Sequence, residues 1–120
     1  MKECGLKENI TWKQLRENVF KISSFLKKIG LRKNDRVAGY VPNTIETVTG
    51  FLASAKNGYI WSSCSPDFGV QGLVDRFRQI EPKVLFTCDY YYYNGKKIDI
   101  LSRIPEILKE IPTIKKVIVF

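Results

Sequence analysis

The segment Tyr93-Asn94-Gly95-Lys96 holds residue types suited to binding an anionic ligand. Asn-Gly is a strong turn signal, and glycine adopts positive φ without steric cost, so backbone N–H groups can face an anion. Lys96 and Lys97 would add positive charge beside that turn, and Tyr93 is able to stack on a purine ring. The alternative is a solvated surface turn, and the residues alone give the two interpretations about equal weight.

Chemistry that needs a nucleophile or a metal has little support in this sequence. Ser62, Ser63 and Ser65 lie close together, but no Gly-x-Ser-x-Gly elbow surrounds them and the chain has no histidine to activate a serine. The expected strand ends offer one carboxylate, Asp89, where a magnesium cluster would need several. Neither a dinucleotide fingerprint nor a Walker phosphate loop is present. We therefore predict no catalytic residue and no metal site in this chain.

Alternating helices and strands are expected to position these residues. Thr11 and Gln14 have the spacing of a capping box ahead of an apolar stripe, and Thr44 can cap a second helix. Pro105 interrupts the last helical pattern, so that the start of this helix stays open. The apolar periodicity predicts helices over about 12–30, 44–58, 70–80 and 98–111, and short apolar runs predict strands over 37–41, 59–64, 84–88 and 117–120.

This alternation predicts an α/β fold, an open parallel sheet with helices on both faces. Ligands of such sheets bind beyond the carboxyl ends of the strands. The functional edge is therefore expected at residues 42–43, 63–68 and 89–97, and beyond residue 120. The chain stops within or at the end of an apolar strand, without the loop and helix that normally follow, so we expect a truncated domain.

Composition limits the size, compartment and partners of the protein. With 120 residues, 44% of them hydrophobic, the chain can form one compact domain or part of one, and it shows neither a secretory signal nor an apolar span. Cys4, Cys64 and Cys88 lack Cys-x-x-Cys spacing, so we expect free thiols in the cytoplasm. A formal charge of +8 would attract nucleic acid, an acidic membrane or a polyphosphate ligand.

Three segments carry a family resemblance: Ile60-Trp61-Ser62-Ser63-Cys64-Ser65-Pro66-Asp67-Phe68-Gly69, Asp75-Arg76-Phe77 and Ile80-Glu81-Pro82-Lys83-Val84-Leu85-Phe86. Together they closely resemble the acetoacetate–CoA ligase family of the adenylate-forming acyl-CoA synthetases. The first segment is the specific one, because other short-chain acyl-CoA synthetases differ at that strand-to-helix junction. Ile10-Thr11-Trp12 and Asp35-Arg36-Val37 are similar to the start of the superfamily's large N-terminal domain.

The resemblance implies that residues 1–120 are part of the N-terminal AMP-dependent synthetase/ligase domain, without a complete second domain. Such enzymes adenylate a carboxylate with ATP and Mg2+ and pass the acyl group to the thiol of coenzyme A. The implied substrates of the complete enzyme are acetoacetate or a similar short acid, ATP and coenzyme A, and the implied partner is the remainder of the same polypeptide. The family's catalytic segments would lie after Phe120, so this chain alone is expected to be inactive and to bind none of these ligands tightly.

The resemblance also implies coenzyme A contacts for Tyr93, Asn94, Gly95, Lys96, Asp67 and Phe68. Acetyl-CoA synthetases resemble this chain at residues 93–96 but carry Arg-Ala-Gly-Arg there, so that Gly95 and Lys96 match while Tyr93 and Asn94 depart. The resemblance places Asp67 and Phe68 where the coenzyme A tunnel passes the strand-to-helix junction. Asp67 is equally suited to capping the helix that follows, and both roles stay open.

Other functions stay open on the residues alone. One is a different short-chain acyl-CoA synthetase, and another is a basic α/β module that binds nucleic acid or serves a structural purpose. The lysines of the first helix and of the C-terminal part are dispersed, as on solvated helix surfaces, rather than gathered in one stripe. We therefore expect no nucleic-acid partner and no membrane partner.

Overall fold

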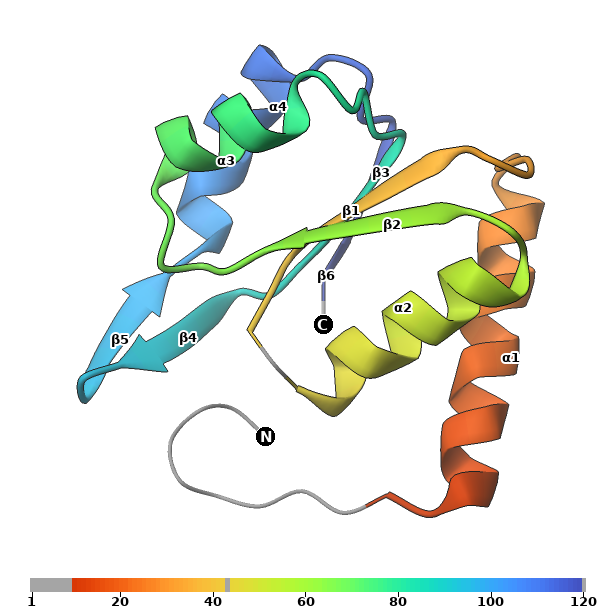
Figure 1. The fold of residues 1–120 in the computed structure, drawn as a ribbon. Coiled ribbons are helices and arrows are strands. Elements are labelled where there is room, and N and C mark those ends of the chain that lie inside the picture. The colour runs from red at the N-terminus through yellow and green to blue at the C-terminus, as the bar shows by residue number, and fades with distance from the viewer. Residues whose placement is uncertain (1–9, 43, 120) are drawn as a thin grey trace.

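A computed structural model describes residues 10–42 and 44–119, except for the side chains of Tyr91 and Tyr93 (Figure 1). The turn expected at Asn43, the thiol of Cys4 and the last residue of the fourth expected strand, Phe120, lie outside the described residues. The elements in chain order are α1 (Trp12–Lys28), β1 (Arg36–Tyr40), α2 (Ile45–Lys56), β2 (Ile60–Cys64), α3 (Val70–Phe77), β3 (Val84–Thr87), β4 (Tyr90–Tyr93), β5 (Lys96–Asp99), the 3-10 helix η1 (Leu101–Arg103), α4 (Ile104–Glu110) and β6 (Lys116–Val119).

The main sheet has four parallel strands in the order β2-β1-β3-β6. Helices α1 and α2 cover one face of it, and α3 and α4 cover the other (Figure 1). The predicted α/β fold with an open parallel sheet is thus confirmed, and its four strands begin and end within one residue of the expected positions. None of the described helices is long and apolar enough to cross a membrane.

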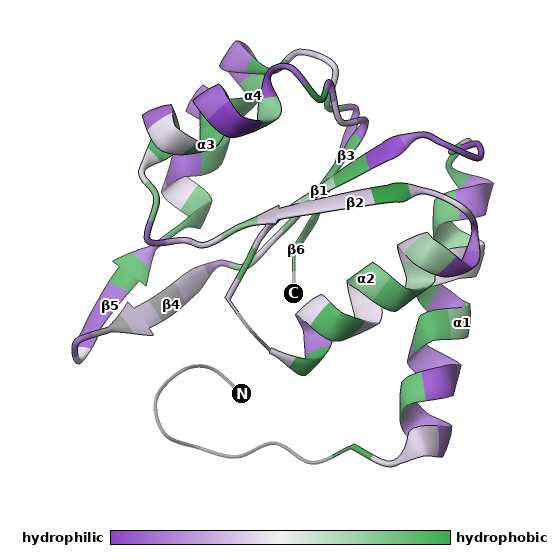
Figure 2. Ribbon diagram, viewed as in Figure 1, coloured by the Kyte–Doolittle hydropathy of each residue, from purple (hydrophilic) through white to green (hydrophobic). Residues whose placement is uncertain are grey.

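Alternation along the strands divides the core into two layers. Ala38, Tyr40 and Leu85 point to the α3 and α4 side, whereas Val37 and Phe86 point to the α1 and α2 side. The helices supply the complementary apolar stripes, and hydrophobic and hydrophilic residues alternate around α1 and α2 in Figure 2. Because both faces of β1 and β3 are covered, these strands read as continuous apolar runs rather than as alternating ones.

Helix starts follow the expected capping chemistry. The backbone N–H of Gln14 donates to Thr11 Oγ1 at 3.0 Å, and the Thr11 N–H donates to Gln14 Oε1 at 3.1 Å, which completes the predicted capping box. The hydroxyl of Thr44 accepts the N–H of Thr47 at 3.3 Å at the start of α2. Both cap predictions are confirmed.

The prediction of a helix over residues 98–111 is wrong in its first part. Ile98 belongs to β5, and the turn at Asn94-Gly95 joins β4 and β5 into an antiparallel hairpin. Ile98 is the partly buried residue of β5 and packs against the core beneath α3 and α4, whereas its neighbours Lys97 and Asp99 are exposed, as the two-residue period of a strand allows. Helix α4 begins only at Ile104, where Pro105 occupies the first turn, a position that needs no backbone N–H donor.

Helix α3 is also shorter than expected. It ends at Phe77 rather than near Ile80, because the chain turns back through Glu81, whose φ is 55°. Its N-cap is Gly69, and no side chain caps it. The capping role considered for Asp67 is therefore wrong, since Asp67 lies two residues before the position from which a side chain caps a helix.

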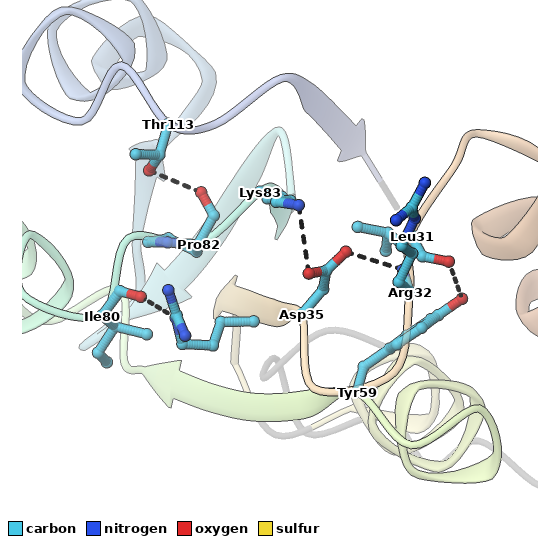
Figure 3. Close-up of polar contacts among 9 residues, drawn as sticks. Leu31, Arg32, Asp35, Tyr59, Ile80, Pro82, Lys83 and Thr113 are labelled. Carbon is cyan, nitrogen blue, oxygen red and sulfur yellow. Dashed lines mark hydrogen bonds and ion pairs between the residues drawn. The ribbon is translucent and has the colours of Figure 1, made fainter.

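Loops at the amino ends of the strands are held together by polar contacts (Figure 3). The Asp35 carboxylate accepts the N–H of Arg32 at 2.8 Å and lies 3.2 Å from Lys83 Nζ. The backbone hydrogen bond from Arg32 and the nearby Lys83 hold the pKa of Asp35 below its usual value, against a smaller opposing effect of burial. Tyr59 adds a hydrogen bond from its hydroxyl to the carbonyl of Leu31 at 3.3 Å.

Gly39 is required by the close approach of Trp61. A Cβ at Gly39 would lie 2.7 Å from Trp61 Cζ2, and the indole is held by the rings of Phe51 and Phe86, with centroids 6.3 and 5.7 Å away. We expect Gly39→Ala to lower the free energy of unfolding by about 1–3 kcal/mol, as overpacked core substitutions do. Urea titration followed by circular dichroism measures this change.

Gly72→Ala is the matched control for this prediction. A Cβ at Gly72 in α3 meets Phe68 at an ordinary contact distance of 3.5 Å. Since alanine favours helix more than glycine does, this change should raise stability by up to about 1 kcal/mol. Equal stabilities of the two variants would show that Trp61 does not restrict Gly39.

Candidate functional site

The carboxyl ends of the four parallel strands lie along one edge of the sheet. Tyr40 is in register with Cys64 on one side and with Thr87 on the other, and Thr87 is in register with Val119. The loop between β2 and α3 leaves this edge, and the hairpin of β4 and β5 follows β3 at the same edge (Figure 1). Both sequence-predicted binding elements therefore stand at the carboxyl edge, where ligands of open α/β sheets bind.

Arg103 links three parts of this edge. Its Nη1 lies 2.6 Å from the Tyr40 hydroxyl, 3.2 Å from the carbonyl oxygen of Pro66 and 3.3 Å from that of Phe68. The Tyr40 hydroxyl in turn donates to the Phe68 carbonyl. We call this set the Arg103 clamp. It ties the centre of the sheet to the β2–α3 loop and to η1, which directly follows the hairpin.

Buried groups at this edge are held in their neutral forms. Burial raises the pKa of the Tyr40 phenol, although the adjacent Arg103 guanidinium acts in the opposite direction. The phenol therefore keeps its proton at neutral pH and can donate to Phe68 while accepting from Arg103. Burial likewise raises the pKa of the Cys64 thiol, which is the opposite of what a nucleophilic thiolate needs.

The β2–α3 loop presents Asp67 and Phe68 at the surface. The N–H of Asp67 donates to Ser65 Oγ at 3.2 Å, and the N–H of Phe68 donates to the Ser65 carbonyl at 3.1 Å. Pro66 is buried, Asp67 is exposed and 44% of the Phe68 surface is accessible. The loop thus combines a fixed backbone with two accessible side chains, an arrangement compatible with the contact role predicted for both residues.

The hairpin turn has the predicted geometry. Asn94 and Gly95 have φ values of 51° and 75°, as in the tight two-residue turns of β-hairpins. A Cβ at Gly95 would meet no atom within 4 Å. Glycine is therefore favoured here by the positive φ of the backbone and not by a close contact with another residue. Asn94, Gly95 and Lys96 are exposed. The side chain of Tyr93 lies outside the described part of the chain, and its stacking on a purine stays a prediction.

The two hairpin lysines lie on opposite faces of the hairpin, which sequence reasoning did not separate. Lys97 pairs with Tyr92 and places its Nζ 4.4 Å from the ring centroid of Tyr90. Lys96 precedes it by one residue and therefore shares the face of Ile98. Lys97 thus contacts the Tyr90 ring on one face of the hairpin. On the opposite face, Lys96 is the basic residue next to the turn.

A shallow pocket of 310 Å³ opens at the base of the hairpin. Asp89, Tyr90, Lys97, Asp99 and Leu101 line it. Two carboxylates against one lysine make this pocket unfavourable for phosphate groups. Among the described residues, no three cysteine, aspartate or glutamate side chains gather in a way that could hold a metal ion. The turn and Lys96 are therefore more favourable for binding an anionic ligand than the pocket at the base of the hairpin.

Residues 3–120 match the model of the family described as AMP-binding enzyme. The chain belongs to this family. It is 45% identical over 112 residues to the acetoacetyl-CoA synthetase of Xenopus tropicalis, covering 93% of this chain and 17% of that protein. It is 47% identical over 107 residues to the acetoacetyl-coenzyme A synthetase of Rhizobium meliloti, covering 88% of this chain and 16% of that protein.

A solved structure supports the same relation. The acetoacetyl-CoA synthetase from Streptomyces lividans superposes with a TM-score of 0.90 and 44% identity, over 93% of this chain and 17% of that one. The chain thus spans about one sixth of the length of the relatives that it matches. The family and the fold of this AMP-binding segment are established by these similarities.

Sequence reasoning missed Arg103 and Tyr40. Tyr40 reads as one residue of an apolar strand, and Arg103 as one of many surface cations. Their contact joins residues 63 positions apart. No local pattern could have found them, because their role arises only when the parallel register and the hairpin bring η1 back to the end of β1.

Loss of the Arg103 clamp should loosen the β2–α3 loop. We expect Arg103→Ala to lower the free energy of unfolding by roughly 1–3 kcal/mol, because three oxygen atoms lose a charged donor. Hydrogen exchange at the amides of Asp67 and Phe68 should become faster. Ser102→Ala, on the same 3-10 turn and exposed, should leave both measurements unchanged. Unaltered exchange in Arg103→Ala would mean that the clamp does not hold the loop.

Proposed function

We propose that residues 1–120 form part of the N-terminal AMP-dependent synthetase/ligase domain of an acetoacetate–CoA ligase and contain no complete second domain. The observation that carries this proposal is the 45% identity to an acetoacetyl-CoA synthetase along 93% of the chain. The complete enzyme would use ATP and Mg2+ to adenylate acetoacetate, release pyrophosphate and transfer the acyl group to coenzyme A. We also infer that it works in the cytoplasm, where its cysteines stay reduced.

This chain would contribute binding and support rather than acid–base or nucleophilic chemistry. It has no histidine, and the raised pKa values of Tyr40 and Cys64 keep both groups protonated. The adenylating groups would therefore come from the remainder of the polypeptide. The role of the described residues would be to hold one side of the coenzyme A path, at the carboxyl edge of the sheet.

Two elements of this edge would contact coenzyme A. The turn Asn94-Gly95 has the positive φ values that turn backbone N–H groups toward an anion, and Lys96 is exposed beside it. These groups would meet the phosphates of the adenosine part, with Tyr93 stacking on the purine. Asp67 and Phe68 would line the path farther along, on a loop that the Arg103 clamp holds in place.

The other candidate functions are less well supported. A different short acid is compatible with the fold, because no acyl-binding residue is identified in this chain. A nucleic-acid-binding or purely structural module is not favoured by membership in the AMP-binding enzyme family. We therefore keep acetoacetate as the proposed substrate.

Activity should require the remainder of the polypeptide. The 120-residue chain, given ATP, Mg2+ and acetoacetate, should release no pyrophosphate above background. A chimera in which residues 10–119 replace the matching segment of the Streptomyces lividans acetoacetyl-CoA synthetase should release it, because the two segments share a TM-score of 0.90. Pyrophosphate release by the short chain would contradict the assignment of the adenylating groups, and a folded but inactive chimera would contradict the proposed enzyme.

Lys96 and Lys97 give a matched pair for the coenzyme A contact. In the chimera, Lys96→Ala should raise the KM for coenzyme A by a factor that corresponds to about 1–3 kcal/mol and leave adenylation unchanged. Lys97→Ala removes the same charge from the opposite face and should change this KM much less. Thioester formation with unaltered dependence on coenzyme A in Lys96→Ala, or equal effects of the two variants, would place the contact elsewhere.

A further inference from the structure

Three basic residues form one row across the amino edge of the sheet, opposite to the carboxyl edge. The N–H of Lys83 donates to the Arg36 carbonyl at 2.9 Å, and the N–H of Lys115 donates to the Lys83 carbonyl at 2.8 Å. These bonds continue the parallel register of β1, β3 and β6 by one residue. Adjacent parallel strands lie about 4.8 Å apart, so three cationic side chains start from neighbouring positions on one face.

This row lines a pocket of 370 Å³, together with Glu81, Pro112 and Thr113. The pocket wall is fixed by hydrogen bonds between loops, because the Thr113 hydroxyl donates to the Pro82 carbonyl at 2.8 Å (Figure 3). Arg36 Nε also donates to the Ile80 carbonyl. Lys83 and Lys115 also border a second hollow of 320 Å³ on the α1 side. The row is therefore set in a concave surface with a fixed backbone.

Positive charge is in excess around this pocket. Glu81 is the one carboxylate that lines it, and Asp35 pairs with Lys83 from the neighbouring loop at 3.2 Å. Lys116 borders the second hollow. In the part of the chain that the structure describes, no hydrogen bond or ion pair engages the Nζ of Lys115. Similar charges on neighbouring strands repel one another unless an anion lies between them.

We propose that Arg36, Lys83 and Lys115 bind a small phosphate-bearing molecule in this pocket. A phosphate group presents several oxygen acceptors, and the pocket lining offers a planar guanidinium, that of Arg36, and the ammonium group of Lys115. Lys83 would add a third cation that is shared with Asp35. Thr113, which is half-buried, lies at the same wall. The site is separated from the carboxyl edge by the five-residue length of β1, about 16 Å, and does not depend on the proposed function.

Titration of the chimera, in which residues 10–119 replace the matching segment of the Streptomyces lividans acetoacetyl-CoA synthetase, with inorganic pyrophosphate tests this site through the amide chemical shifts of the replaced segment. We expect saturable shifts at Lys83, Thr113 and Lys115. Lys115→Glu should weaken binding at least about tenfold, because it removes a charge-assisted contact and adds a repulsive charge. Lys21→Glu, an identical change on the exposed surface of α1, should leave the affinity within about twofold.

Glu81→Gln provides a change in the opposite direction. It removes the carboxylate from the pocket lining and should tighten pyrophosphate binding by about threefold or more. The absence of saturable shifts at these three amides would overturn the proposal. Equal weakening by Lys21→Glu and Lys115→Glu would also overturn it, because binding would then follow the net charge of the chain rather than this pocket.

Discussion

Both faces of β1 must be buried, and this constraint arranges the other elements. Val37, Ala38 and Tyr40 have no exposed surface, and full burial of a side chain the size of Val37 stabilises the fold by about 1.5–3 kcal/mol. Burial on two sides requires two helical layers, and a parallel neighbour on each edge satisfies the backbone of β1. A parallel register then places all strand ends on two opposite edges, where the polar residues collect.

The two edges are held by different kinds of contact. At the carboxyl edge a single guanidinium, that of Arg103, donates to carbonyl oxygens of a loop and to the Tyr40 hydroxyl. At the amino edge Asp35 joins a backbone N–H and Lys83. The first arrangement leaves loop side chains accessible while fixing the backbone that carries them. The second compensates only part of the positive charge, and no carboxylate among the described residues forms an ion pair with Lys115.

The sequence predicts what local patterns determine. Apolar runs, cap residues and the Asn94-Gly95 pair predicted the four parallel strands, two helix starts and a tight turn, because each depends on a few adjacent residues. The hairpin strand at Ile98 was missed, since Leu101, Leu108 and Ile111 fit a helical stripe equally well. The capping role predicted for Asp67 was wrong because the N-cap lies two residues later, at Gly69. The role of Arg103 could not be predicted because its partners are distant in sequence. The contacts that could not be predicted from the sequence are those between strands and loops that lie far apart along the chain.

The hairpin places the two adjacent lysines, Lys96 and Lys97, in different surroundings. Alternation in β5 turns Lys97 toward the Tyr90 ring, where the cation–π contact and the two nearby aspartates compensate its charge. Lys96 faces the other way and lies beside a turn whose φ values are positive at two successive residues. Among the described side chains, none forms an ion pair or a cation–π contact with Lys96. In the proposed coenzyme A contact, a phosphate approaching this tip would lie beside the exposed ammonium group of Lys96 and a turn with two positive φ values, a type of backbone geometry that can bind anions.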